Sequence, residues 1–432
     1  MTTIPYKIER LANGGQGISY TNDKVFFVEG ALPGESGTAD VLQEKKRFGR
    51  ARAVSRESDS EMRVACDSCP QSASCGGCGF RHVRSDCALS LKAGALCAEI
   101  VKLAHLDPIE PVLYPVSGPN GGLDGLRRRI RLHVSHGRIG YFAKDSHYIV
   151  TASGCAAIDN ALRKTVAALE SSPKPPKGFA CDLQIDLDDS DRPFLHVRAG
   201  EFEPSRVLKT AQAEPWVRQL EATGIFAGIR CGDCHWTGDS AIRDTVSIEG
   251  AQDIVYWRRI GDFAQATAAG NAHLHACVSA FLAQTKPQKV ADLFAGSGNL
   301  SFRAAQSVPE VCAFEYFCDE AMFARGAADN QARDPNFGRV TLRLCDLTRG
   351  FPAAAAACEA IICDPAREGL SEKMCQDLCT SRVQHILYIS CEATNLARDI
   401  ARLKPSFHVA SLGFVDMFPQ TPHLETVAIL SR

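Results

Sequence analysis

The 432-residue chain lacks any apolar stretch that approaches the ~18 consecutive residues needed to cross a bilayer. Its first residues, MTTIPYKIERLANGGQG, contain no apolar segment behind a basic flank, so we expect no secretory signal. An excess of one charge is also missing, because the formal net charge is −2, and this argues against a protein that coats nucleic acid through its overall charge. We therefore expect a cytoplasmic monomer that makes no membrane contact and binds any nucleic acid through local patches.

The signatures of phosphate recognition are absent as well. In VADLFAGSGNLSF, Gly296 and Gly298 separate an apolar strand from a helix, but no Walker lysine follows and no third glycine has the dinucleotide spacing. Glu315 ends the next apolar run, where a carboxylate can accept both hydroxyls of a ribose, and Asp346 ends the third, where it can accept from an adenine amino group. A ribose and an adenine without phosphates describe S-adenosylmethionine better than NAD or ATP.

Disulfides are a poor explanation for the 19 cysteines, because the number is odd and we expect a reducing compartment. Most of these thiols stand in apolar runs, where a cysteine behaves as a small hydrophobe. Cys69, Cys75 and Cys78 are different: their spacing, C-x5-C-x2-C, is too tight for a disulfide framework and lacks the paired halves of a zinc ribbon. A metal site with a fourth, distant ligand is the natural interpretation, and Cys66 is an alternative ligand.

Chain length and pattern predict two or three domains. Short strands broken by glycine turns predict a small β-barrel over residues 1–60. Strand-like runs predict a central β-rich domain from 61–90 and 125–258, and alternating strands and helices predict a Rossmann-like doubly wound α/β domain from 91–124 and 259–432.

Two basic clusters stand out along the chain, and the first is a plausible phosphate-facing edge. The first follows the last barrel strands and the second opens the central domain; their members are Lys45, Lys46, Arg47, Arg50 and Arg52, then Arg127, Arg128, Arg129 and Arg131. A solvated basic strand face is the alternative for the barrel cluster.

A candidate catalytic group stands at the ends of the later strands. Asp364 follows the fourth strand of the α/β domain and Cys391 follows the fifth, and both ends should face the ligand crevice. Cys391 also precedes a helix, whose N-terminus should lower the pKa of the thiol. Glu425 begins the last strand.

A thiolate with a carboxylate suits methylation of uracil at C5. This carbon is too poor a nucleophile to attack a sulfonium methyl group unaided, but thiolate addition at C6 places enolate charge on it. A base must then remove the C5 proton before the thiolate can leave. We predict Cys391 as nucleophile and Glu425 as base.

The motifs match one family in order along nearly the whole chain. FAQATAAGN, DLFAGSGNLSF, ICDPAREG, ISCEATNLARD and DMFPQTPHLE resemble the cofactor and catalytic motifs of bacterial 5-methyluridine RNA methyltransferases, which modify 23S ribosomal RNA or tRNA. GGQGI and FVEGALPGE resemble a TRAM domain, an OB-like RNA-binding barrel, and CPQSASCGGCGFRH resembles the iron–sulfur motif of the ribosomal branch.

The resemblance implies a role for each matching residue. The cofactor and the target base would be held by Gln265, Phe294, Asn299, Glu315, Asp346 and Asp364. A [4Fe–4S] cluster in the central domain would be held by Cys69, Cys75, Cys78 and Cys155, with zinc as the rival occupant. Two positions depart from the family: Glu392-Ala393 replaces Asn-Pro after the nucleophile, and Thr267 replaces the last residue of FxQxN.

The predicted function is therefore methylation of uridine C5 in 23S rRNA, with tRNA as the second target. A catalytically weak RNA-binding or ribosome assembly factor is the alternative suggested by Glu392, whose charge beside the thiolate would oppose a low pKa. A DNA cytosine methyltransferase is less consistent, since its nucleophile follows proline and Cys391 follows Ser390.

Overall fold

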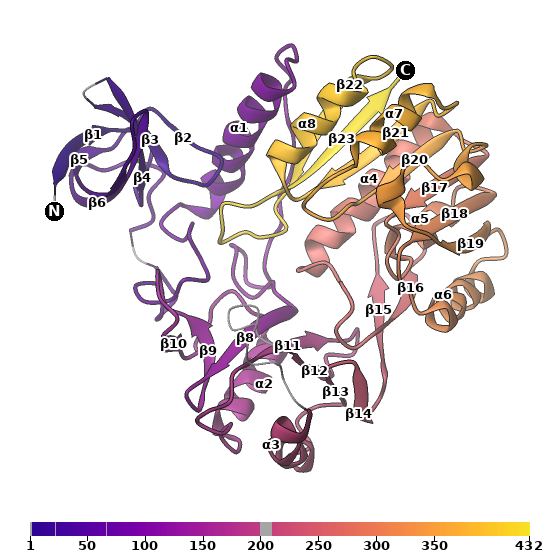
Figure 1. Ribbon diagram of the computed structural model, residues 1–432, viewed down its shortest axis with the longest axis horizontal. Coiled ribbons are helices and arrows are strands. Elements are labelled where there is room, and N and C mark those ends of the chain that lie inside the picture. Colours follow the sequence, from indigo (N-terminus) through magenta and orange to yellow (C-terminus); the bar gives the residue numbers. More distant parts are fainter. Residues whose placement is uncertain (1, 22, 66, 199–209) are drawn as a thin grey trace.

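The computed structural model describes residues 2–21, 23–65, 67–198 and 210–432, so Cys66, the alternative metal ligand, lies outside the described residues. Figure 1 shows three groups of elements: a barrel at the N-terminus, a large sheet that carries the C-terminus, and a smaller sheet below both. Among the described helices, none is both long and apolar enough to pass through a bilayer.

The N-terminal sheet has the strand order β1-β5-β6-β4-β3-β2. Alternating side chains face inward, as in the pattern of β1, and Tyr6, Phe26 and Val28 form part of the small core. The strands are β1 (Thr3–Lys7), β2 (Arg10–Leu11), β3 (Gly17–Thr21), β4 (Lys24–Glu29), β5 (Ser36–Glu44) and β6 (Phe48–Ser58). The predicted all-β module is present.

The middle sheet has the order β10-β9-β8-β11-β12-β13-β14. Its central strand β11 is buried along its whole length, because α2 and α3 contribute Leu162, Val166 and Trp216 to the same core. Its elements are β8 (Arg129–Ser135), β9 (Arg138–Phe142), β10 (Ile149–Val150), α2 (Asn160–Ser171), β11 (Cys181–Leu187), β12 (Pro193–Arg198), α3 (Thr210–Ala222), β13 (Gly228–Cys231) and β14 (Cys234–Gly238). The ribbon β15 (Ala241–Val246) and β16 (Ile254–Arg259) leads to the large sheet.

The large sheet is doubly wound, with the order β19-β18-β17-β20-β21-β23-β22-β7. Its strands are β7 (Val112–Tyr114), β17 (Lys289–Leu293), β18 (Glu310–Glu315), β19 (Arg339–Leu344), β20 (Ala360–Cys363), β21 (His385–Ser390), β22 (His408–Val415) and β23 (Glu425–Ser431). One core contains side chains of α1 (Ser85–Leu103), α7 (Glu372–Thr380) and α8 (Ala393–Leu403); the other contains those of α4 (Ala268–Thr285), α5 (Asn299–Ala305) and α6 (Glu320–Arg333).

The direction of β23 positions the candidate site. Strands β17 to β21 are parallel, whereas β23 runs antiparallel to β21, with Ser390 opposite Thr426. The first residue of β23, Glu425, therefore lies at the same sheet edge as Cys391, which directly follows Ser390.

Candidate active site

A tight turn follows β17 at this sheet edge. Phe294, Gly296 and Gly298 all have positive φ, at 64°, 54° and 91°. A Cβ atom on Gly298 would approach the rings of Phe302 and Phe323 within 3.0 Å, so glycine is required there both for φ and for space. The turn brings backbone N–H groups to the ligand side of the sheet.

Glu315 is held against this turn from the end of β18. Its carboxylate accepts hydrogen bonds from the backbone N–H of Gly296 (2.9 Å) and of Tyr316 (2.7 Å). Asp346, beyond β19, caps a short 3-10 helix at Leu347–Arg349 and accepts from the backbone and hydroxyl of Thr348 and from Arg349. These bonds lower the pKa of Asp346.

Asn299 faces α4. Its amide Nδ2 donates to Asn271 (2.9 Å), while its Oδ1 lies 3.1 Å from Asn271 Nδ2 and 2.8 Å from His275 Nε2. Arg303 extends this hydrogen-bond network by donating to His275 Nδ1. Burial lowers the pKa of His275 to about 3, so the ring is neutral. Both polar ends of Asn299 thus fix the glycine turn to α4, and its contact with a cofactor stays a prediction.

Thr267, the departure from the family motif, has a structural role. It is the N-cap of α4 and its Oγ1 accepts a hydrogen bond from the Gly270 N–H (3.2 Å). Threonine is a good capping residue, so this substitution keeps the start of the helix intact.

Cys391, Glu425 and Asp364 come together from three adjacent strands. Cys363 of β20 pairs with Tyr388 of β21, which brings Asp364 beside the end of the strand that precedes the thiol. Gln265 donates to Asp364 Oδ2 at 3.1 Å. Burial raises the pKa of Asp364 to about 7 and raises that of Glu425 well above its usual range, with the Asp364 charge adding to the latter. The two carboxyls therefore hold a proton near neutral pH.

The expected low pKa of the Cys391 thiol is wrong for this structure. Burial, with the charges of Glu425 and Asp364 adding to it and Arg367 opposing it, raises the pKa of the thiol to about 11. Burial and two acidic neighbours outweigh the start of α8. Arg367, within ICDPAREG, was not predicted as a site residue, although its position three residues after Asp364 was an available signal.

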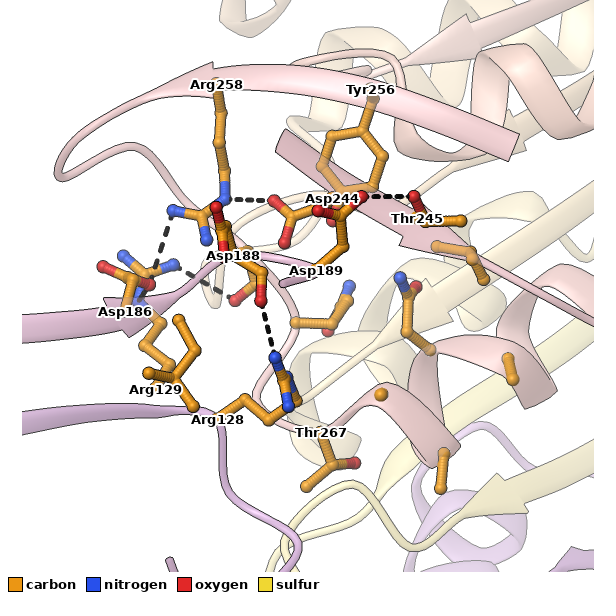
Figure 2. A pocket seen from close by; sticks show the side chains of 18 of the residues that line it. Arg128, Arg129, Asp186, Asp188, Asp189, Asp244, Thr245, Tyr256, Arg258 and Thr267 are labelled. Atoms are coloured by element: carbon orange, nitrogen blue, oxygen red, sulfur yellow. Dashed lines mark hydrogen bonds and ion pairs between the residues drawn. The ribbon is translucent and has the colours of Figure 1, made fainter. Parts of the chain in front are cut away.

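A cavity of about 560 Å³ reaches Gln265, whose amide contacts Asp364 (Figure 2). Its other lining residues come from β8, β11, β15, β16, the start of α4 and the adjoining loops. Arg258 pairs there with Asp244 (2.6 Å) and Asp186 (3.4 Å). These charges, together with Arg129, connect the middle sheet to the β15–β16 ribbon.

The candidate metal ligands lie in one region. Cys75 is within electrostatic range of Cys69 and Cys155, and Cys78 is within range of Cys155 and Cys75. The backbone of Cys75 also forms an isolated antiparallel β-bridge with Ala143, the residue directly after β9. No group of three or more His, Cys, Asp or Glu side chains in the described ranges converges closely enough to form a ready metal site. The four-sulfur donor set fits an iron–sulfur cluster chemically.

The predicted phosphate-binding edge of the barrel is only partly free. Arg50 and Arg52 form ion pairs with Glu29, and Arg52 also pairs with Asp145. Lys45, Lys46 and Arg47 occupy the exposed connection between β5 and β6. In the second cluster, Arg128 pairs with Asp159 and Asp191, and Arg129 pairs with Asp186.

Two family descriptions match the chain. "TRAM domain" matches residues 2–54, which form the barrel, and "tRNA (Uracil-5-)-methyltransferase" matches residues 236–432. In fold, the chain is similar to the Pyrococcus abyssi tRNA (uracil-54, C5)-methyltransferase solved in complex with S-adenosyl-L-homocysteine. That likeness has a TM-score of 0.71 and 20% identity, and it covers 99% of both chains.

Curated relatives extend the match to the whole chain. The 23S rRNA (uracil(1939)-C(5))-methyltransferase RlmD of Pseudomonas fluorescens is 31% identical, over 98% of this chain and 92% of its own length. The protein of the same name from Chromohalobacter salexigens is 30% identical, over 98% of this chain and 88% of its own length. The chain is therefore a member of the S-adenosylmethionine-dependent RNA (uracil-5-)-methyltransferase family.

Proposed function

We propose that this protein methylates C5 of a uridine in 23S rRNA through a covalent bond between Cys391 and C6 of the base. The observation that carries the proposal is the meeting of Cys391, Glu425 and Asp364 at one edge of the large sheet. The choice of 23S rRNA rests on relatives of that name that match almost the whole chain.

The first step is addition of the Cys391 thiolate to C6, which creates an enolate with charge at C5. Asp364, which is protonated below about pH 7, can donate a hydrogen bond to a base oxygen and so favour that charge. Gln265 fixes the Asp364 carboxyl through a 3.1 Å hydrogen bond. S-adenosylmethionine supplies the methyl group that C5 takes up.

Glu425 then removes the proton from C5, and the C6–S bond breaks to release Cys391. Burial at 6% exposure excludes water from this carboxyl, and its raised pKa makes the carboxylate a stronger base than an exposed glutamate. The raised pKa of Cys391 means that the thiolate is scarce in the free enzyme and must be formed with the base in place.

Cofactor binding is assigned to the turn after β17 and the next two strand ends. Glu315 would accept the ribose hydroxyls and Asp346 the adenine amino group, while Phe294 and Asn299 hold the turn. Gln265 and Asp364 stand on the side of the target base.

The cysteine loop is proposed to hold a [4Fe–4S] cluster through Cys69, Cys75, Cys78 and Cys155. Four soft sulfur donors support this assignment, since Cys75 interacts electrostatically with Cys69, and both Cys75 and Cys78 interact with Cys155. The cluster would tie the loop to the central domain and takes no part in methyl transfer.

Tritium release tests the activity directly. RNA that carries 5-tritiated uridine should lose tritium to water only when S-adenosylmethionine is present, since C5 exchanges its hydrogen for the methyl group. A factor that binds RNA without turnover, as Glu392 beside the nucleophile could suggest, would release none. Mapping 5-methyluridine in rRNA and tRNA from a deletion strain identifies the target: loss from tRNA alone would contradict the 23S assignment.

A further inference from the structure

Arg367 lies on the loop between β20 and α7, three residues beyond Asp364. The side chain of Asn395, in the first turn of α8, donates to the Arg367 carbonyl at 2.7 Å. Arg398 of the same helix donates to the carbonyl of Glu368 at 2.6 Å. Because α8 starts two residues after Cys391, these bonds fix the Arg367 backbone relative to the nucleophile.

The guanidinium of Arg367 is exposed and available to a ligand. The residue is exposed, and its side chain forms no hydrogen bond or ion pair within the part of the chain that the structure describes. The neighbouring arginines Arg398 and Arg402 are different, since both pair with the buried Asp399. The Arg367 guanidinium is therefore available to an anion that a substrate carries.

The field of Arg367 reaches the catalytic centre. It lowers the pKa of Cys391 and of Glu425, and it also acts on His423, two residues before Glu425. The other charges on Cys391 are the carboxyls of Glu425 and Asp364, which repel anions. An exposed arginine therefore acts on the same centre as two buried acidic groups.

An RNA substrate brings phosphates to this centre. A uridine that is turned out of its stack into the pocket carries its flanking phosphates to the entrance. A guanidinium matches a phosphate through two parallel N–H···O bonds, which an ammonium cannot form. We propose that Arg367 binds the phosphate next to the target uridine and so holds the base over Cys391. The inference rests on the proposed function, because it requires an RNA substrate.

The test compares Arg367→Met and Arg367→Lys with the wild type on a 23S rRNA transcript that carries 5-tritiated uridine. Arg382→Met is the matched control: Arg382 is exposed and precedes β21, at the opposite sheet edge from Cys391. The loss of one phosphate contact should raise KM about tenfold in Arg367→Met. The slope of log binding constant against log salt should fall by about one unit.

Arg367→Lys should restore the salt slope while KM stays above the wild-type value, because lysine keeps the charge but not the two-bond geometry. Arg382→Met should match the wild type in both measurements. If Arg367→Met keeps the wild-type salt slope, no phosphate is bound there and the inference is wrong, whatever happens to kcat. If Cys391→Ala is inactive while Arg367→Met is normal, this inference alone fails; if Cys391→Ala still methylates, the proposed function fails.

Discussion

At the scale of single residues, the pocket is more acidic than its motifs suggest. Asp364 and Glu425 share a buried space, and their charges oppose ionisation of Cys391. Ionisation of either carboxyl is unfavourable for the free protein, since burial opposes the charge and raises the pKa of both groups. Such a cost is expected at a site selected for chemistry rather than for stability.

Asp364→Asn should therefore stabilise the protein at high pH. The pKa of Asp364 in the folded state, about 7, exceeds its ordinary value of 3.8, so the folded chain holds this proton more tightly than the unfolded chain. Stability then falls as pH rises from about 4 to about 7, and the asparagine variant removes this loss, which is at most about 4 kcal/mol. Melting temperatures at pH 5 and pH 8 measure the difference, which should appear mainly at pH 8.

Asp377→Asn provides a control of opposite sign. Hydrogen bonds from Lys373 and the Phe351 backbone lower the pKa of Asp377, so its charge stabilises the folded state above the ordinary pKa. Its asparagine variant should gain no stability at pH 8. A melting temperature of Asp364→Asn below the wild type at pH 8 would contradict the account of the buried carboxyls.

The sequence predicted Cys391 from the end of its strand and Glu425 from the start of the last strand, and the structure brings the two residues to one sheet edge, while their catalytic roles stay predictions. The expected low pKa of the thiol was wrong because burial depends on packing between segments far apart in the chain. Arg367 was given no role because an exposed arginine in a loop has no periodic pattern. The sequence could not show that Asn299 is bound by α4, since Asn271 and His275 come from a different element.

At the scale of elements, the buried charges around Arg258 join the β15–β16 ribbon to the middle sheet. Arg258 is 2% exposed and pairs with Asp244 and with Asp186, which is 1% exposed. Replacing Arg258 by Met leaves both carboxylates without this partner and should lower the free energy of unfolding by about 3 kcal/mol. Thermal unfolding followed by tryptophan fluorescence provides the measurement, because Trp257 is the adjacent residue.

Arg339→Met is the matched control, since Arg339 is 70% exposed at the side chain and pairs with Glu310 on the surface. Its cost should be below about 1 kcal/mol. Equal costs for the two variants would show that the buried network contributes no more than a surface pair.

The barrel should contribute to RNA binding through its β5–β6 connection. Replacing Lys45, Lys46 and Arg47 by Gln together should weaken binding and reduce the salt slope by up to about two units, because each freed phosphate contributes about 0.7. Filter binding of the 23S transcript at several salt concentrations measures the slope. Deleting residues 1–54 is a less direct test, because Leu11 and Leu32 of the barrel pack against Phe80.

The double variant Arg50→Gln, Arg52→Gln is the control for charge alone, as both arginines already pair with Glu29. It should change the slope less than the triple variant does. The sequence predicted the barrel and its basic edge from alternation and glycine turns, but it could not tell which arginines are neutralised, because Glu29 and Asp145 lie on other strands or loops.

At the scale of the whole molecule, the cysteine loop connects the three sheets. Gly76 donates to the Phe142 carbonyl at the end of β9, and Phe80 packs on the barrel. The backbone N–H of Phe80 also donates to Gln420, in the segment that leads to Glu425. The loop therefore contacts the barrel, the middle sheet and the segment that precedes Glu425.

Anaerobically purified protein should be brown and contain about four irons per chain, because four thiolates in a reducing compartment suit an iron–sulfur cluster. Cys75→Ser should lower solubility and RNA binding, since the loop has little core of its own. Elemental analysis and the visible spectrum check the first expectation. Stoichiometric zinc, or a Cys75→Ser variant with normal folding and activity, would overturn the assignment.

The fold as a whole was accessible from the sequence, because strand periodicity, glycine turns and βα alternation are local signals. The antiparallel direction of β23, which places Glu425 beside Cys391, could not be predicted from the sequence. The β7 strand, which joins the far edge of the large sheet, could not be predicted from the sequence either, since a strand of three residues is too short to show a periodic pattern. The domain limits at 60, 90, 124 and 258 stay predictions.

The covalent mechanism is tested most directly by trapping the protein–RNA adduct. With Glu425→Gln, addition of Cys391 and methyl transfer should proceed, but the C5 proton stays and the thioether cannot be eliminated. A denaturant-resistant protein–RNA species should therefore accumulate on gels with this variant. It should be absent from Cys391→Ala and from the double variant, both of which should still bind RNA. A Cys391→Ala enzyme that methylates uridine, or a Glu425→Gln enzyme that turns over normally without adduct, would contradict the account.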